Sequence, residues 1–128
     1  MKKIIYTDKA PAPIGPYSQA VEANGMLFVS GQIALDPLSG ELIQDDIETE
    51  TRQVFSNLKA ILEARGLTFD HVVKSTVSVA VMNQVARINA VYAEYFSGEE
   101  TPARETVQAA ALPKFVNIEI SVIAVIGQ

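Results

Sequence analysis

The sequence contains no cysteine and only one histidine, His71. Without cysteine the chain cannot form a disulfide, a thiolate nucleophile or the usual zinc sites, and a single histidine leaves none to spare for a Ser-His-Asp triad. His71 follows Thr68, Phe69 and Asp70 in a stretch expected to be a loop after a helix, which favours an ordinary surface residue. Much nucleophilic and metal-based chemistry is therefore excluded.

Positive charge is also scarce, because 10 Lys and Arg residues stand against 15 Asp and Glu residues, for a net charge of -5 and a pI near 4.8. Sequence-independent binding to nucleic acid relies on basic side chains, so nucleic acid is not an expected partner. No apolar run reaches the roughly 18 residues of a membrane span, and the first residues lack the apolar stretch of a secretory signal. We therefore expect no membrane association and a cytoplasmic location.

The chain does have enough apolar residues for one core. It has 128 residues, of which 48% are hydrophobic and 20% charged, so residues 1–128 are expected to form one domain. Asn24-Gly25 is the strongest short hairpin signal in the sequence. Apolar periodicity and turn residues predict strands at 3–7, 17–23 and 26–33, a helix from Asp45 or Asp46 to Gly66, a strand at 72–82, a helix capped by Asn83 and ending near Gly98, and strands at 104–112 and 117–126.

This order of elements predicts an α+β fold in which two helices cover one face of a five- to six-stranded sheet. The face under the helices is expected to carry Val73, Val77, Val79, Val107, Ala109, Ile118, Ile120 and Val122. The opposite face is expected to carry Thr76, Ser78, Ala80, Thr106, Gln108, Ala110, Ser121 and Ile123. Small uncharged side chains of this kind suit neither water nor a core, so we expect an oligomer built on that face.

Arg104 is the first candidate functional residue. Strand alternation places it with Thr106 on the predicted assembly face, at the beginning of a strand where a cleft can open. Glu119 lies on the same kind of face in the last strand, where a carboxylate is costly unless it is paired. One interpretation is a structural salt bridge between the two residues, formed across strands or across subunits. The other is an anion site, in which the guanidinium holds a carboxylate and the glutamate acts as a base. The pattern leaves both open.

Short blocks occur in order along the chain: 12–20 (APIGPYSQA), 29–33 (VSGQI), 89–96 (NAVYAEYF), 102–104 (PAR) with 112–113 (LP), and 118–120 (IEI). Together they closely resemble the Rid family of reactive intermediate deaminases, also called YjgF-type proteins or L-PSP endoribonucleases. The likeness spans essentially all 128 residues. It implies a chorismate-mutase-like (YjgF-like) α+β fold that assembles as a homotrimer, with ligand clefts between neighbouring subunits.

The resemblance also implies an activity. It is the hydrolysis of 2-iminobutanoate and 2-iminopropanoate, products of pyridoxal-phosphate dehydratases, to 2-oxo acids and ammonia, with no cofactor. By position, Arg104 would bind the substrate carboxylate and Glu119 would position or deprotonate the attacking water. Tyr17 and Ser30 would line the pocket and donate hydrogen bonds, and Gly31 would let backbone approach the ligand. An iminium carbon is already electrophilic, so positioning the anion and a water can supply the acceleration.

Structural roles stay open for several of these residues. Tyr17 fits a strand aromatic with its hydroxyl at the surface, Ser30 fits a filler in a tight hairpin, and Gly31 fits a β-bulge. Asn89 interrupts the apolar stripe of its helix, which favours a hydrogen bond to a loop backbone. The aromatic residues within 92–96 are expected in the core.

Three positions depart from the family pattern. Thr106 stands where many deaminating members have cysteine, and its backbone N–H would still reach a carboxylate, so activity is expected to survive with altered packing. Glu105 stands where a small or apolar residue is usual, and strand alternation predicts that its side chain points away from that of Arg104. Ser121 stands where a second glutamate is common, and nothing in the sequence explains this change.

Two other functions fit parts of the pattern. A non-catalytic binder would use the same arginine to capture a small carboxylate for a regulatory or chaperone-like purpose. The ribonuclease activity once attached to the family is disfavoured by the acidic pI, the single histidine and the lack of a basic stripe. The sequence as a whole favours the imine deaminase.

Overall fold

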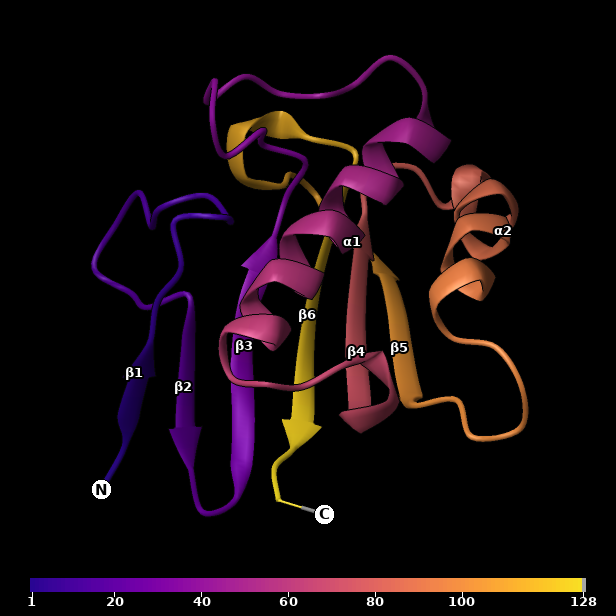
Figure 1. The fold of residues 1–128 in the computed structure, drawn as a ribbon. Helices are drawn as coiled ribbons and strands as arrows, with labels where there is room; N and C mark the ends of the chain where they lie inside the picture. The colour runs from indigo at the N-terminus through magenta and orange to yellow at the C-terminus, as the bar shows by residue number, and fades with distance from the viewer. Residues whose placement is uncertain (128) are drawn as a thin grey trace.

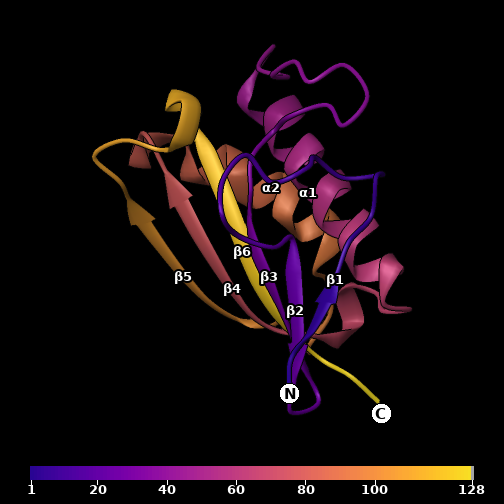
Figure 2. The same ribbon diagram turned by 90° about the vertical axis from the view of Figure 1, so that its left-hand side faces the viewer.

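The structure, a computed structural model, describes residues 1–127. Its main elements in chain order are β1 (Lys3–Ile5), β2 (Ala20–Ala23), β3 (Met26–Gln32), α1 (Ile47–Ala64), β4 (Val72–Val79), α2 (Val85–Tyr95), β5 (Ala103–Gln108) and β6 (Ile118–Val125). Single turns of 3-10 helix occur at Phe69–His71, Met82–Gln84 and Pro113–Phe115. Both helices lie on one face of the sheet (Figure 1), and a view along the sheet shows that they leave the other face open (Figure 2). The predicted α+β fold is confirmed.

The sheet is mixed, with the strand order β1-β2-β3-β6-β4-β5. All neighbouring strands are antiparallel except β4 and β5, which run parallel because α2 crosses over between them. The turn between β2 and β3 is formed by Asn24 and Gly25, whose φ angles of 57° and 74° are both left-handed, as a two-residue hairpin turn requires. The predicted hairpin is therefore confirmed. In the strand order, β5 lies at one edge of the sheet.

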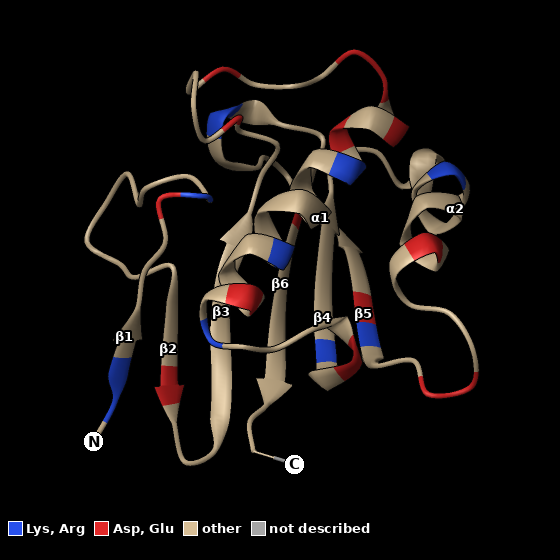
Figure 3. Cartoon of the chain, viewed as in Figure 1, with Lys and Arg blue, Asp and Glu red and all other residues tan. Residues whose placement is uncertain are grey.

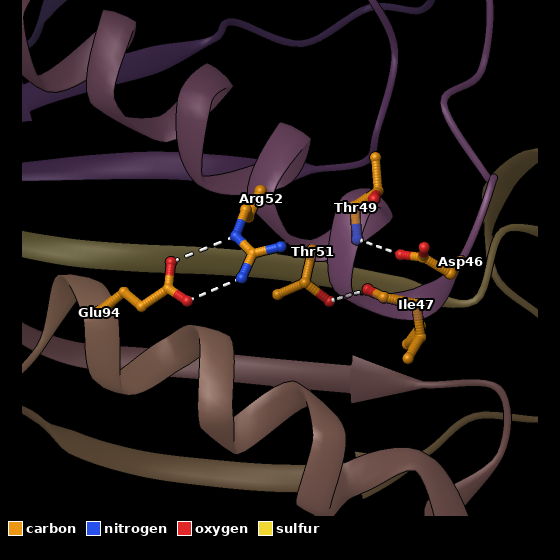
Figure 4. Close-up of polar contacts among 6 residues, drawn as sticks. All are labelled: Asp46, Ile47, Thr49, Thr51, Arg52 and Glu94. Atoms are coloured by element: carbon orange, nitrogen blue, oxygen red, sulfur yellow. Dashed lines mark hydrogen bonds and ion pairs between the residues drawn. The ribbon is translucent and has the colours of Figure 1, made fainter.

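α1 begins where Asp46 caps it. The Asp46 carboxylate accepts a hydrogen bond from the backbone N–H of Thr49 at 2.7 Å (Figure 4), so the cap is Asp46 and not Asp45. The helix ends just before Gly66, whose φ of 76° turns the chain away from the helical path. The face toward the sheet is apolar because fully buried side chains recur at helical spacing, namely Val54, Phe55, Leu58, Ile61 and Leu62.

Ion pairs connect the two helices. Arg52 of α1 donates to both carboxylate oxygens of Glu94 in α2, at 3.2 and 2.8 Å (Figure 4). Arg87 of α2 makes the same paired contact with Glu48 of α1, at 2.8 and 2.7 Å. Basic residues are otherwise spread over β1, β4, β5 and both helices among acidic ones (Figure 3). No helix within residues 1–127 combines the length and the apolar character that crossing a bilayer requires.

The start of the second helix differs from the prediction. Asn83 is predicted to cap it, but α2 begins at Val85, and its N-cap residue, Gln84, makes no side-chain hydrogen bond. The reason is that the chain enters α2 through the 3-10 turn, so Asn83 lies inside that turn instead of before the helix. The strands predicted at 17–23 and 104–112 are also shorter in the structure, as β2 and β5.

The sheet face opposite the helices, called the uncovered face below, carries the predicted side chains at four positions. Thr76, Ser78, Ser121 and Ile123 lie there with intermediate exposure. Phe28 lies beside Ile123 across the β3–β6 pair and is 43% exposed, so the face also has an apolar centre. Its composition remains unusual for a surface that meets only water.

Val73 is predicted under the helices but is 43% exposed. The β4–β6 register shifts between Val72 and Lys74, which marks an irregularity in pairing at Val73. Val72, at 4% exposed, is buried in its place. The alternation beyond this point agrees with the prediction.

On β5 the predicted faces are exchanged. The register pairs Arg104 with Ser75, which is buried under the helices, so Arg104 and Thr106 point to the helix side. Val107, predicted in the core, is 51% exposed and lies beside Ser78 on the uncovered face. A shift of one residue moves every side chain of a strand to the other face, and this short edge strand has too few apolar residues to fix the phase.

Candidate functional site

A cavity of about 450 Å³ opens on the uncovered face, and Tyr17 and Ser30 line it. The Tyr17 hydroxyl accepts a hydrogen bond from the backbone N–H of Ile14 at 3.4 Å, so its own hydrogen stays free to donate. The Ser30 hydroxyl already donates to the carbonyl of Ser18 at 2.6 Å, so it offers a ligand lone pairs but no hydrogen. The structure thus brings two predicted pocket residues together and distinguishes what each can do.

The loop that presents Tyr17 is held by a buried glutamine. Gln19, only 2% exposed, accepts from the N–H of Thr7 and donates to the carbonyls of Thr7, Ala10 and Pro11. Prolines in this segment lack N–H donors, so the loop cannot close many backbone bonds of its own. The sequence does not predict this role, because position 19 lies within a stretch that is predicted to be a strand.

Glu119 lies directly against Gly31. A Cβ added to Gly31 would come within 2.7 Å of both the carboxyl carbon and Oε2 of Glu119, so any larger residue would displace the carboxylate. The β3–β6 register also shifts between Val29 and Gln32, which places Gly31 in an irregular part of the strand. Gly31 therefore makes room for a side chain, and its predicted approach to a ligand stays a prediction.

Glu119 projects from the uncovered face, since it pairs with Ser78 across β6 and β4. The side chain is half-buried, and burial raises the pKa of its carboxyl because the charged form loses hydration. Within residues 1–127 it takes part in no ion pair that would offset this loss. A carboxyl group with a raised pKa accepts a proton more readily than an ordinary glutamate, so Glu119 is suited to act as a base.

Arg104 lies at the start of β5, and uncharged groups hold its guanidinium. Its Nη1 donates to Oδ1 of Asn89 at 2.8 Å, and its Cζ lies 4.7 Å from the centre of the Tyr92 ring. Both partners project from α2, where a spacing of three residues places them on one face. Asn89 thus binds the Arg104 side chain and not the loop backbone that the sequence favours. In the sequence, the three-residue spacing of Asn89 and Tyr92 already indicates that the two side chains lie on one helix face, where both can contact the same partner.

No carboxylate neutralises Arg104 within the described part of the chain. The ion pairs there are made by Arg52, Arg65, Lys74 and Arg87. Glu105, the next residue, turns to the other face and binds Lys74 at 2.8 Å, and this hydrogen bond lowers the pKa of Glu105. The prediction that Glu105 points away from Arg104 is confirmed, and the guanidinium keeps donors for a ligand.

Thr106 is two residues beyond Arg104 on the same side of β5. Its Oγ1 is buried without a hydrogen-bond partner among residues 1–127. Its backbone N–H points away from the sheet, because Ala109 donates inward to the carbonyl of Val79 and these directions alternate along a strand. A guanidinium and a backbone N–H at one free edge can bind a carboxylate together.

Arg104 and Glu119 do not meet within one chain. Arg104 shares its row with Ser75 on the helix side, whereas Glu119 shares its row with Ser78 on the uncovered face. Because β4 separates β5 from β6, their backbones lie about 10 Å apart at the usual strand spacing. The prediction of a common face is therefore wrong, and a salt bridge between these residues inside one chain is excluded.

His71, predicted to be an ordinary surface residue in a loop, has a structural role in a short turn. Its Nδ1 accepts a hydrogen bond from the backbone N–H of Thr68 at 3.0 Å and closes the 3-10 turn that leads into β4. Within residues 1–127 no three histidine, aspartate or glutamate side chains are grouped as a metal site would need.

The sequence is similar to those of known proteins along nearly its whole length. A family model described as endoribonuclease L-PSP matches residues 7–126. A RutC family protein of Pyrococcus horikoshii is 54% identical over 124 residues, which are 97% of this chain and 98% of that protein. A 2-iminobutanoate/2-iminopropanoate deaminase of Mus musculus is 47% identical over 127 residues, 99% of this chain and 93% of the mouse protein.

Solved structures are similar over the same extent. A Rid family protein of Yersinia pestis superposes with a TM-score of 0.95 at 47% identity, covering 98% of this chain and 100% of that one. TdcF of E. coli with bound serine superposes with a TM-score of 0.91 at 42% identity, covering 98% of this chain and 99% of that one.

Proposed function

The chain belongs to the Rid family, also described as endoribonuclease L-PSP, and from this premise we propose that it hydrolyses 2-iminobutanoate and 2-iminopropanoate. Water adds to the imine carbon, the carbon–nitrogen bond breaks, and the products are a 2-oxo acid and ammonia. Relatives in mouse and rat that carry this activity in their names are 47% and 48% identical.

The observation that supports the proposal most directly is that the Arg104 guanidinium is held by uncharged groups. Its guanidinium contacts an amide and an aromatic ring, and it forms no ion pair within residues 1–127. An arginine kept apart from acids can bind the substrate carboxylate through two parallel N–H donors. The N–H of Thr106 at the same strand edge adds a third donor. The serine bound to TdcF, a relative, is likewise a small carboxylate.

A complete site on this proposal takes residues from two copies of the chain. Arg104 and Glu119 lie on opposite faces of one sheet, so one substrate cannot contact both in a single copy. The free edge of β5 and the uncovered face, with Phe28 and Val107 partly exposed, are surfaces that a second copy would cover. The homotrimer implied by the family resemblance would set Arg104 of one copy beside Glu119 of the next.

In this arrangement each side chain has a separate task. Arg104 and the Thr106 N–H hold the carboxylate, while Glu119 accepts a proton from the attacking water. Tyr17 donates its free hydroxyl hydrogen to the substrate or to the water, and Ser30 accepts a hydrogen bond. The imine carbon is activated by its own nitrogen, so orientation and desolvation supply the acceleration.

The test adds the chain to a threonine dehydratase reaction and follows the appearance of 2-oxobutanoate and ammonia. The wild type is expected to accelerate both. R104A is expected to lower kcat/KM about 100-fold, since charged hydrogen bonds to the carboxylate are lost. R52A is the matched control, because Arg52 pairs with Glu94 between the helices, and it should keep its activity. A wild type that leaves both product rates unchanged would refute the proposal.

The second candidate is a binder without catalysis, favoured by one observation: a single chain holds the arginine but not the acid beside it. Such a protein would bind 2-oxobutanoate with a measurable heat and yet leave the dehydratase reaction unchanged. The same samples therefore decide between the two functions.

A further inference from the structure

Tyr92 lies between the aromatic cluster of the core and Arg104. The residue is 8% exposed, and its ring centre is 5.8 Å from that of Phe55 and 4.8 Å from that of Phe96. At the tip of the ring, the Tyr92 hydroxyl is 2.6 Å from Oγ of Ser75 in a buried hydrogen bond. Packing at the sides and a hydrogen bond at the tip together prevent the ring from tilting.

The guanidinium of Arg104 rests on this ring. Its Cζ is 4.7 Å from the ring centre, well inside the range of about 6 Å for a cation–π contact. Ser75 is paired with Arg104 across β4 and β5. The residue that binds the tip of the Tyr92 ring and the residue that stacks on its face are therefore neighbours in the sheet. Strand pairing, helix packing and the hydroxyl bond thus determine one position for the ring under the arginine.

A ring and a carboxylate hold an arginine differently. The ring attracts the guanidinium through its face, so the N–H groups in the guanidinium plane remain available. A carboxylate from the same protein would occupy two of them. The bond to Asn89 uses one of the five donors and fixes the rotation of the plane.

We propose that Tyr92 is a positioning residue for the substrate carboxylate. Its ring sets the plane and direction of the Arg104 guanidinium, and Ser75 holds the ring in place. Tyr92 itself does not touch the substrate. This role rests on the proposed function, because it assumes that Arg104 binds the carboxylate.

The experiment measures the Kd of 2-oxobutanoate by titration calorimetry, and KM and kcat for imine hydrolysis, on the full chain. Y92L removes the π face, and Kd and KM are expected to rise by about three- to thirtyfold, the effect of losing a partly desolvated cation–π contact. The change in kcat should be smaller, because the lost contact acts on carboxylate binding. Y92F keeps the ring and is expected to recover most of the affinity.

Y95L is the matched control. Tyr95 also projects from α2 and stacks on Phe55 at 4.3 Å, and the cation–π contact of Arg104 is made with Tyr92 instead. Its loss should lower thermal stability without raising Kd. If Y92L does not unfold cooperatively, Y92M takes its place, because the unbranched thioether fills the ring's space without a π face.

The outcomes separate the two proposals. Weaker binding in Y92L or Y92M, recovered in Y92F and absent in Y95L, supports the positioning role. Weaker binding in R104A together with unchanged Kd and KM in the Tyr92 variants overturns the positioning role and leaves the proposed function intact. A wild type that neither binds 2-oxobutanoate nor hydrolyses the imine overturns the proposed function and this role with it.

Discussion

Glu119 is a half-buried carboxyl group whose pKa is raised by the loss of hydration. As a base it works only when ionised, so kcat/KM is expected to fall as the pH falls through this raised pKa. The acid limb should therefore lie at a higher pH than for an ordinary glutamate. Mixing freshly generated imine with the protein across a pH series measures this limb. In E119Q the limb should disappear, along with most of the activity, and a limb that persists in E119Q would assign it to another group.

The raised pKa of Glu119 also predicts how the thermal stability of the protein depends on pH. A carboxyl whose pKa is higher in the folded than in the unfolded state contributes stability that is present at low pH and lost as the pH rises through the folded pKa. E119Q is therefore expected to unfold at a higher temperature than the wild type at pH 7 and at nearly the same temperature at pH 4. These melting curves require no substrate. If the difference in melting temperature between E119Q and the wild type is the same at pH 7 and at pH 4, burial of Glu119 is not what raises its pKa.

Individual residues were predictable from the sequence where one side chain and its nearest neighbours decide the outcome. Asn24-Gly25 forms the hairpin turn, and Glu105 turns away from Arg104 because strand alternation requires it. The roles of Asn89 and Gln19 were not predictable, because each depends on partners 8 to 15 positions away that only the folded chain brings near. The aromatic support of Arg104 was missed for the same reason.

At the scale of elements, Glu50 connects α1 to the strand that carries Glu119. Its side chain is fully buried, and its two carboxylate oxygens accept from the backbone N–H and the side-chain Nδ2 of Asn117, at 2.9 and 2.7 Å. E50A would leave both partly buried donors of Asn117 without this partner, and we expect a loss of about 3 kcal/mol in the free energy of unfolding.

The control for this prediction is E63A, because Glu63 is exposed in the last turn of the same helix. Urea unfolding of the two variants should show a large loss for E50A and a change within about 0.5 kcal/mol for E63A. Equal losses in both would show that the bond to Asn117 contributes nothing specific.

The elements also show where sequence periodicity becomes unreliable. α1 was predictable because its apolar stripe continues over five turns and is closed by a cap and a glycine. β5 was not, because an edge strand of six residues is exposed on both faces and its single valine points to the uncovered one. The exchanged faces moved Arg104 from the predicted assembly face to the helix side.

At the scale of the whole molecule, the separation of Arg104 and Glu119 predicts complementation between inactive variants. R104A and E119Q are expected to be inactive alone, but refolding them together in equal amounts should restore about a quarter of the wild-type activity. Half of the protomers then carry an intact Arg104, and half of their neighbours carry an intact Glu119. Ammonia release measured before and after mixing tests this.

Wild-type chain carried through the same unfolding and refolding is the control for recovery. If it regains activity while the mixed variants do not, each site is built within one chain and the two-copy arrangement is wrong. The fold class and the helix-covered face could be predicted from the sequence. The opposite placement of the two charged residues could not, because it follows from the register of three strands.

The contact between Gly31 and Glu119 limits how this chain can change. Gly31 does not have a left-handed φ, so its backbone would accept other residues, and the restriction comes from the carboxylate that occupies the space of a side chain. A larger residue at position 31 therefore requires the side chain at position 119 to move or to become smaller. In a library that varies both positions, folded members should include combinations in which a bulkier residue at 31 accompanies a shorter one at 119, whereas members that hydrolyse the imine should keep Gly31 and Glu119.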